Sequence, residues 1–372
     1  MLKRFSCYAS AAFGLEGLVS SELRELGFAD VTAENGGVRF SATAEELMLC
    51  NLKMHYCERV FLIAAEKSCF SFEDLFQLVL SVPWEQHTQG NEAYNVSAKC
   101  ARSKLMSPRD CQSVTKKAIL ERIRRTTGQK VFPENGQAFY IQISVHSDLV
   151  KVLVNTSGEA LSRRGYRTWN GEAPMRETLA AALVHLSPWK TCKPLYDPCC
   201  GTGTILTEAA LMALNRAPGI IRHFAMENMY LFRDVPFDRI RESVRQKQEN
   251  GGTLSIAGSD ISQEAVELAN RHIRQAGLSD IVHVSCKPLQ ELHLQETGGV
   301  FICNPPYGER LGDQKACRSL YRDLRNLKEA HPTWSMCVIS SDPAFERYFG
   351  KKADKKRRLY NGRLECTYFI YY

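Results

Sequence analysis

The tetrapeptide Asn304-Pro305-Pro306-Tyr307 combines two hydrogen-bond acceptors with an aromatic ring, directly after the apolar run 300–303. An exocyclic amine on a nucleobase is a poor nucleophile, because its lone pair is delocalised into the ring. Two acceptors aimed at its hydrogens would favour a tetrahedral nitrogen and stabilise the positive charge that develops on attack. We expect the Asn304 side-chain oxygen and the Pro305 carbonyl to be these acceptors, on a turn that the prolines stiffen. Tyr307 offers a face for an extruded base, although a rigid loop with a surface tyrosine is the plain structural alternative.

A glycine turn lies about 100 residues upstream, between an apolar stretch that ends in Asp197 and a helix that begins near Ile205. Gly201 and Gly203 let the backbone approach a ligand, and the helix start offers N–H groups to an anion. Asp197 would repel a pyrophosphate but suits the ammonium and sulfonium of S-adenosylmethionine (SAM). Leu206 replaces the third glycine of a dinucleotide fingerprint, so SAM is favoured over NAD. The expected cofactor residues of this turn are Asp197, Cys199, Gly201, Thr202, Gly203 and Thr204.

The next two strands should complete the cofactor site. The strand 254–259 is followed by Asp260, which is placed to accept the ribose hydroxyls, and by Ile261. After the strand 281–285 an acid that binds the adenine amine would be typical, but Cys286-Lys287 stands there, so the adenine contact stays unassigned. In a doubly wound sheet the first and fourth strands flank the ligand crevice, so Asn304 should also reach the cofactor. Methyl transfer would then depend on positioning, without metal or covalent nucleophile.

The order of expected elements divides the chain into three segments. Residues 1–65 follow the pattern strand, helix, strand, strand, helix, strand, with a hairpin at Asn35-Gly36, which predicts a ferredoxin-like α+β segment. Residues 66–165 predict a second α+β segment. Residues 166–372 alternate strands and helices, which predicts an α/β, Rossmann-like domain with a mixed seven-stranded sheet.

The middle segment is strongly basic. Between Lys99 and Lys130 there are ten Lys or Arg residues against Asp110 and Glu121. Clustered cations gain affinity for nucleic acid by releasing counterions from phosphates, although most charge runs are solvated helix faces. Beside the catalytic pattern we favour RNA binding. The cations expected to contact RNA are Lys99, Arg102, Lys104, Lys116, Lys117, Arg124 and Arg125.

Charge, hydropathy and cysteine spacing indicate the class of the protein and its expected cellular compartment. The formal net charge is +7, which suits a polyanionic partner, and no apolar run is long enough for a membrane span. The first residues carry two cations without an apolar stretch behind them, so we expect no secretory signal and a cytoplasmic protein. The fourteen cysteines show no C-x-x-C spacing, which favours buried thiols and no structural metal.

The sequence resembles the THUMP-domain RNA guanine-N2 methyltransferases, in particular the bacterial RlmL-like enzymes of 23S ribosomal RNA. The matching motifs are Ser162-Arg163-Arg164-Gly165-Tyr166-Arg167, Ala173-Pro174-Met175-Arg176-Glu177-Thr178-Leu179-Ala180, the glycine turn, and Asn304-Pro305-Pro306-Tyr307-Gly308-Glu309-Arg310-Leu311. The resemblance implies a THUMP domain that binds RNA, ribosomal RNA as substrate and guanine N2 as target. It also implies that the methionine end of SAM is lined by Ala173, Pro174, Glu177 and Thr178.

Three other functions are compatible with parts of the sequence. An adenine-N6 methyltransferase acting on DNA or RNA would use the same tetrapeptide. A non-catalytic RNA-binding assembly factor could keep the fold, but Asn304 and the glycines would not need to persist in it. An NAD oxidoreductase is disfavoured by Leu206 and by the tetrapeptide. Neither the modified nucleotide nor the oligomeric state follows from the residues.

Overall fold

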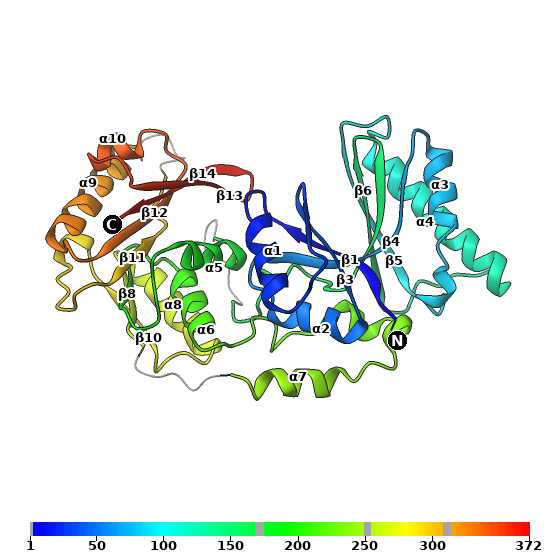
Figure 1. Ribbon diagram of the computed structural model, residues 1–372, viewed down its shortest axis with the longest axis horizontal. Helices are drawn as coiled ribbons and strands as arrows, with labels where there is room; N and C mark the ends of the chain where they lie inside the picture. The colour runs from blue at the N-terminus through cyan, green and yellow to red at the C-terminus, as the bar shows by residue number, and fades with distance from the viewer. Residues whose placement is uncertain (1–2, 168–174, 249–253, 308–313) are drawn as a thin grey trace. The chain divides into compact units, whose positions relative to one another are not determined.

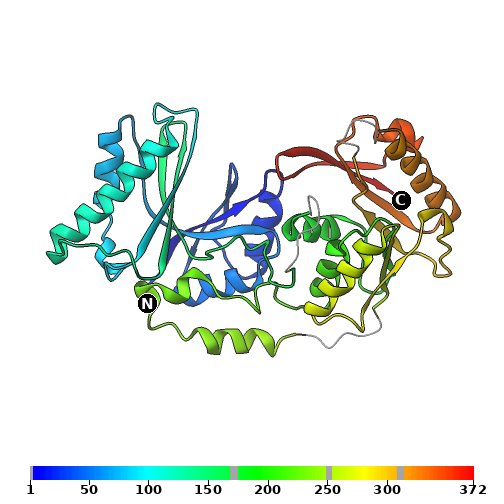
Figure 2. The same ribbon diagram turned by 180° about the vertical axis from the view of Figure 1, so that it is seen from behind.

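The computed structural model describes residues 3–167, 175–248, 254–307 and 314–372 and divides the chain into two compact units. The first unit comprises Met1–Ala11, Val19–Leu161 and Arg222–Ser243. The second comprises Ala12–Leu18, Ser162–Ile221 and Val244–Tyr372. Figures 1 and 2 show both units from opposite sides, and each is described here by itself.

One seven-stranded sheet forms the centre of the first unit. Its order is β2-β3-β1-β4-β7-β6-β5, and all neighbours are antiparallel except β5 and β6. The strands are β1 (Phe5–Ala11), β2 (Thr32–Glu34), β3 (Gly37–Ala42), β4 (Cys57–Ser68), β5 (Ala93–Ala101), β6 (Ala138–His146) and β7 (Leu149–Asn155). The ferredoxin-like strands and those of the following segment therefore share one sheet.

The helices of this unit begin and end where the sequence supplies caps. Thr43 and Glu46 form a reciprocal capping box on α2, and Ser107 caps α4, which Gly128 ends in the left-handed conformation at φ 74°. The helices are α1 (Glu16–Glu25), α2 (Ala44–Lys53), α3 (Phe72–Leu80) and α4 (Pro108–Thr127), with the 3₁₀ turn η1 (Trp84–Gln86). In both views α3 and α4 lie on the same side of β5 and β6 (Figures 1 and 2).

Two features of the first unit differ from the expected segments. The expected limit between residues 65 and 66 falls inside β4, because this long strand pairs with β1 along one part and with β7 along the other. The stretch Arg222–Ser243, expected in the catalytic segment, groups with the first unit. It carries η2 (Ala225–Asn228), η3 (Tyr230–Phe232) and most of α7 (Phe237–Arg245). Phe232 packs its ring edge-on against Phe5 of β1, with centroids 5.7 Å apart.

The second unit contains a seven-stranded sheet of order β10-β9-β8-β11-β12-β14-β13. Its first five strands are parallel, and β14 runs antiparallel to both neighbours. The strands are β8 (Leu195–Asp197), β9 (Ile256–Asp260), β10 (Val282–Cys286), β11 (Val300–Cys303), β12 (Ser335–Ser340), β13 (Lys355–Asn361) and β14 (Leu364–Tyr371). This is the mixed, Rossmann-like sheet that the alternating pattern predicts.

Helices cover both faces of this sheet. The helices are α5 (Glu177–Leu186), α6 (Thr204–Ala213), α8 (Gln263–Gln275), α9 (Gln314–Ala330) and α10 (Phe345–Phe349), with the 3₁₀ turn η4 (Leu289–Glu291). On one face, Tyr321 of α9 and Phe345 of α10 pack with Phe301 of β11 in a fully buried cluster. On the other, the Tyr368 hydroxyl donates a hydrogen bond to the Leu183 carbonyl of α5. Apolar burial on both faces holds the strand ends rigidly, and loops at those ends can carry a site.

Candidate active site

The glycine turn follows β8 as expected and is held by backbone geometry that only glycine adopts easily. Gly201 has φ 51° and Gly203 has φ 76°, both in the left-handed region. A Cβ added at Gly203 would lie 3.2 Å from the Cβ of Ala269 in α8, so this position also needs a residue without a side chain. A Cβ at Gly201 would meet nothing within 4 Å, so open space lies beside the turn.

Asp197 is buried at the end of β8, and its carboxylate accepts a hydrogen bond from the Cys199 N–H at 3.0 Å. Burial raises the pKa of this carboxyl well above its ordinary value, against the Cys199 hydrogen bond, and repulsion from Asp260 adds to the rise. A positively charged group beside Asp197 would offset both effects, because it favours the ionised carboxylate. The residue is therefore suited to a cationic ligand.

Asp260 ties the second strand to the glycine turn. One carboxylate oxygen accepts from the Gly201 N–H at 2.9 Å, and the other accepts from the Ser262 N–H at 3.0 Å. Each carboxylate oxygen has a second lone pair, so hydroxyl donors can still bind there. Ile261 follows with 78% of its surface exposed, which is unusual for a large apolar side chain. Cys286-Lys287, where the usual adenine-binding acid is missing, lies next to Asp260 and Ile261. The Lys287 N–H donates a hydrogen bond to the Asp260 carbonyl.

Asn304, Pro305, Pro306 and Tyr307 leave the sheet at the end of β11. Asn304 is half-buried, and its side-chain oxygen accepts a hydrogen bond from the Tyr307 hydroxyl. Burial raises the pKa of that hydroxyl, and the Cys366 thiol of β14 adds to the rise. The amide oxygen keeps a second lone pair, so the contact orients the Asn304 side chain without using up its acceptor capacity.

The sheet brings the turn and the tetrapeptide to the same edge. Strands β8 and β11 are adjacent and parallel, with Val300 opposite Leu195 and Phe301 opposite Tyr196. The carboxyl ends of the two strands therefore open on one side. Burial raises the pKa of the Cys303 thiol well above its ordinary value, and the nearby Cys199 and Asp197 raise it further. Residues that stand about 100 positions apart in sequence thus lie close together in space.

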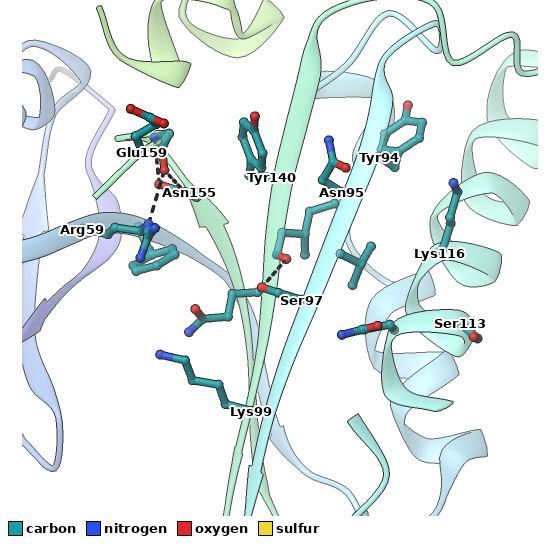
Figure 3. A pocket seen from close by; sticks show the side chains of 16 residues that line it. Arg59, Tyr94, Asn95, Ser97, Lys99, Ser113, Lys116, Tyr140, Asn155 and Glu159 are labelled. Atoms are coloured by element: carbon teal, nitrogen blue, oxygen red, sulfur yellow. Dashed lines mark hydrogen bonds between the residues drawn. The ribbon is translucent and has the colours of Figure 1, made fainter. Parts of the chain in front are cut away.

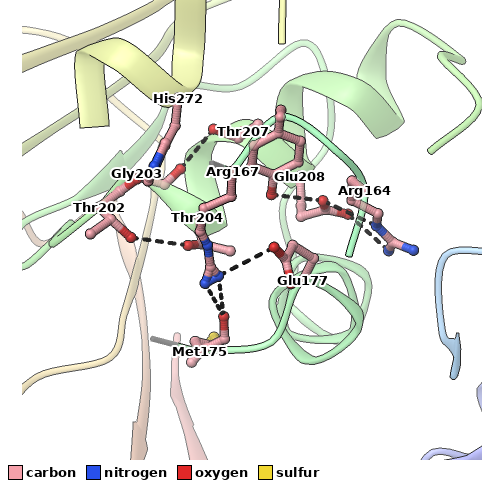
Figure 4. A network of polar contacts seen from close by, with 11 residues as sticks. Arg164, Arg167, Met175, Glu177, Thr202, Gly203, Thr204, Thr207, Glu208 and His272 are labelled. Carbon is pink, nitrogen blue, oxygen red and sulfur yellow. Dashed lines mark hydrogen bonds and ion pairs between the residues drawn. The ribbon is translucent and has the colours of Figure 1, made fainter. Parts of the chain in front are cut away.

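Figure 4 shows a buried network of charged side chains near the turn, in which sequence reasoning assigned no role to Arg164 or Glu208. Arg164 and Glu208 of α6 form an ion pair at 3.1 Å, with side-chain exposures of 2% and 0%. The Tyr166 hydroxyl donates to the same carboxylate at 3.0 Å. Glu208 is the one acidic residue of the otherwise apolar helix α6. Because a buried carboxylate needs a charged or hydrogen-bonding partner, this residue could have indicated a cation nearby.

A second part of this network holds the start of α5. Arg167 forms an ion pair with Glu177 at 3.2 Å and donates two hydrogen bonds to the Met175 carbonyl. Burial raises the pKa of the Glu177 carboxyl above its ordinary value, and Arg167 opposes the rise. Of the four residues expected at the methionine end of SAM, Glu177 and Thr178 are buried here. The other two, Ala173 and Pro174, lie outside the described residues.

The cations expected to bind RNA lie on β5, the loop that follows it and α4. Several are in ion pairs that the sequence pattern did not reveal: Lys116 with Glu134 at 2.8 Å, and Arg124 and Arg125 with Glu121. The other expected cations are Lys99, Arg102 and Lys117, and Lys104, whose Nζ lies 5.4 Å from the centre of the Phe70 ring. Exposed pairs of this kind contribute about 0–1 kcal/mol each, so a phosphate could displace them.

The fourteen cysteines are all free thiols. Within the described ranges, no group of three His, Cys, Asp or Glu side chains is arranged to hold a metal ion. No helix in those ranges is both long and apolar enough to cross a membrane.

Comparison with known proteins accounts for nearly the whole chain. Residues 164–370 match the RMKL-like methyltransferase domain, residues 6–61 the RlmL ferredoxin-like domain and residues 69–155 the THUMP domain. A relative from Bacillus subtilis (strain 168) is YpsC, whose name assigns it provisionally to the RNA methyltransferases. It is 34% identical over 100% of this chain and 97% of its own length.

Longer relatives carry a more specific name. The ribosomal RNA large subunit methyltransferase K/L of Shewanella frigidimarina is 31% identical over 99% of this chain. The chain spans about half the length of such relatives, 52% in this case. Among solved structures, SMU.472, described as a methyltransferase on provisional grounds and complexed with S-adenosylhomocysteine, is 39% identical. It has a TM-score of 0.93 and covers 100% of this chain and 99% of its own.

A Rossmann-like sheet that carries a glycine turn and Asn-Pro-Pro-Tyr at neighbouring strand ends defines a SAM-dependent methyltransferase. The domain matches and relatives then place the chain in the THUMP-domain, RlmL-like methyltransferase family. The residues present fit the cofactor, since a Cβ at Gly201 would meet nothing within 4 Å and the buried Asp197 carboxylate is suited to a cationic group. When bound, SAM supplies a methyl group on a positively charged sulfur.

Proposed function

We propose that this protein transfers a methyl group from SAM to the exocyclic N2 amine of a guanine in RNA, with 23S ribosomal RNA as the substrate. The observation that carries the proposal is the position of Asn304 at the end of β11, beside the strand that leads into the glycine turn. The names of the K/L relatives support a ribosomal substrate, and the THUMP match supports RNA.

In the proposed reaction the protein's own groups hold the amine while the new N–C bond forms and the methyl–sulfur bond of the donor breaks. The surplus proton on nitrogen leaves to water after transfer. The Asn304 oxygen and the Pro305 carbonyl accept hydrogen bonds from the two amine hydrogens and stabilise the charge that develops on nitrogen. The Tyr307 hydroxyl, which already donates to the Asn304 oxygen, keeps that side chain in one rotamer. The ring of Tyr307 lies beside the target base, and the prolines fix the turn.

Cofactor contacts follow from the strand ends. We place the methionine end of SAM near Asp197, Glu177 and Thr178, and the ribose near Asp260. The exposed Ile261 would cover one face of the adenine, which supplies an apolar contact where an acid is missing. The turn residues Cys199, Gly201, Thr202, Gly203 and Thr204 would line the cofactor between them.

The test is methyl transfer from radiolabelled SAM to ribosomal RNA that was purified from cells lacking this protein, followed by nucleoside mass spectrometry. The expected product is N2-methylguanosine, formed by the wild-type protein and not by the Asn304→Ala variant. Methylation at any other atom, or wild-type rates in the variant, would contradict the proposal.

A second candidate is adenine-N6 methylation. It is favoured by a solved structure from Listeria monocytogenes str. 4b F2365, which is described as a predicted N6-adenine-specific DNA methylase. That protein is 36% identical over 100% of this chain and 96% of its own, with a TM-score of 0.93. Duplex DNA offered beside RNA in the same assay separates the two candidates, since N6-methyladenine would appear in the DNA digest.

A further inference from the structure

A polar groove of about 800 Å³ lies in the first unit, along the edge strand β5 (Figure 3). Its walls come from β4, β5, β6, the first half of α4 and the residues that follow β7. All of these belong to one compact unit, so the groove does not depend on how the two units are arranged. Two cations expected to contact RNA, Lys99 and Lys116, line it, but no residue of the proposed methyl-transfer step does.

The strand register places an aromatic ring beside two amides. Tyr140 of β6 is paired with Asn95 of β5, and Gln142 is paired with Ser97 two residues further along. The alternate residues Phe139 and Ile141 are buried, so Tyr140 and Gln142 point to the opposite face of the sheet.

Exposure and charge favour a nucleic-acid ligand. Tyr140 is 40% exposed, although its strand β6 has a neighbouring strand on each side. Arg59 and Lys99 line the same groove, and Arg59 is oriented by a hydrogen bond from its Nε to the Gly158 carbonyl at 3.3 Å. Of the residues that line the groove, Glu159 is the only acid. Figure 3 shows Tyr140 and Asn95 next to each other, with Lys99 further along β5.

These side chains match what unpaired nucleotides require. Exposed bases of single-stranded RNA stack on aromatic side chains of a sheet face and are read on their edges by hydrogen-bonding groups. An amide carries both a donor and an acceptor, so Asn95 and Gln142 can each pair with a base edge. A duplex hides these edges, and its phosphates would need a wider basic surface.

We infer that this groove binds an unpaired stretch of the substrate RNA, with one base stacked on Tyr140 and its edge hydrogen-bonded by Asn95 and Gln142. The cations Arg59 and Lys99 bind the adjoining phosphates. This site is separate from the cations at the C-terminal end of α4. The inference rests on the proposed function only in taking RNA as the substrate.

The test measures fluorescence anisotropy of a labelled single-stranded RNA of mixed sequence and of a duplex of equal length. Tyr140→Ala should weaken binding of the single strand about 5- to 150-fold, the range expected for loss of one stacked base. Tyr140→Phe keeps the ring and should bind within about twofold of the wild type, because stacking needs only the π-face. Phe72→Ala, which removes a 37% exposed aromatic ring at the start of α3 outside the groove, is the matched control and should have no effect.

Salt dependence identifies the type of contact. Lys99→Ala should reduce the slope of log affinity against log salt by roughly 0.7, whereas Tyr140→Ala should leave the slope unchanged. Wild-type affinity in Tyr140→Ala, or preference for the duplex, would overturn the inference. The inference would also be overturned if an extended peptide bound to the open edge of β5 and the single-stranded RNA did not bind at all.

Activity separates this inference from the proposed function. With an RNA that the wild-type protein methylates, Tyr140→Ala should raise KM for that RNA and leave kcat unchanged. If the wild-type protein methylates no RNA but Tyr140 still governs oligonucleotide binding, the proposed function fails and the groove assignment stands. If methylation proceeds and Tyr140→Ala alters neither KM nor binding, the groove assignment fails alone.

Discussion

The buried pair of Arg164 and Glu208 should be among the most sensitive positions of the second unit. Their side chains are 2% and 0% exposed and 3.1 Å apart, so neither charge can be rehydrated when the other is removed. Breaking such a pair costs about 3–5 kcal/mol, because an uncompensated charge remains buried. We therefore expect Glu208→Leu and Arg164→Met each to lower the free energy of unfolding by about this amount.

The double variant with Arg164→Met and Glu208→Leu should be much closer to wild type. Replacement of a whole buried pair by apolar residues is often neutral, although the Tyr166 hydroxyl loses its acceptor at a cost of about 1–3 kcal/mol. The two substitutions should thus be non-additive by at least about 2 kcal/mol.

Urea unfolding, followed by far-ultraviolet circular dichroism and tryptophan fluorescence, measures these changes. The matched control is Glu329→Gln, which removes an exposed pair with Arg325 in α9, where the side chains are 59% and 46% exposed. This control should cost less than about 1 kcal/mol. A Glu208→Leu variant as stable as the control, or a double variant whose loss equals the sum of the single losses, would refute the reasoning.

Three further outcomes are expected. Asn304→Ala should lower kcat about 100- to 1,000-fold, as removal of one transition-state hydrogen bond does, with SAM affinity in calorimetry nearly unchanged. Gly203→Ala should lose about 1–2 kcal/mol of stability from backbone strain, and more from contact with Ala269; Gly298→Ala, at φ 74° in open space, measures the strain alone in urea unfolding. Burial, with a smaller contribution from the charge of Lys3, lowers the pKa of His87 from its ordinary 6.5 to about 4. Stability should therefore fall between pH 6.5 and 4 by up to about 3 kcal/mol, and His87→Gln should flatten this acid limb in thermal melts.

The direction of the His87 effect follows from proton binding. Since the folded state holds His87 neutral in this range, the unfolded state binds the extra proton, and stability rises with pH. Equal acid limbs in the wild type and His87→Gln would show that another group controls acid unfolding. For Gly203→Ala, a loss no greater than that of Gly298→Ala would remove the packing argument at Ala269.

Local sequence signals predicted most of the elements and the strand-end motifs. The hairpin at Asn35-Gly36 is confirmed, because its turn residues and the two strands that it joins are local in sequence. The glycine turn and Asn304 could be brought together from sequence alone, because parallel strand order fixes which loops are neighbours.

Long-range pairings of polar residues could not be predicted in the same way. Arg164 meets Glu208 across 44 residues, and no periodicity links the two positions. The Tyr140 groove depends on which face of β6 is left uncovered, and that is decided by the packing of other elements. The positive charge expected on α4 is also partly neutralised by Glu134, which lies outside α4 in sequence and forms an ion pair with Lys116.

The twelve-residue strand β4 has a consequence for dissecting the molecule. Its early residues pair with β1 and its later residues with β7, so the ferredoxin-like and THUMP parts have a backbone in common. Excision at residue 66 would cut through this ladder and leave hydrogen-bonding groups of β7 open to other chains, a known route to aggregation. Truncated proteins that keep β4 whole to Ser68 together with β7 should stay monodisperse in solution. Proteins cut in the middle of β4 should aggregate and precipitate.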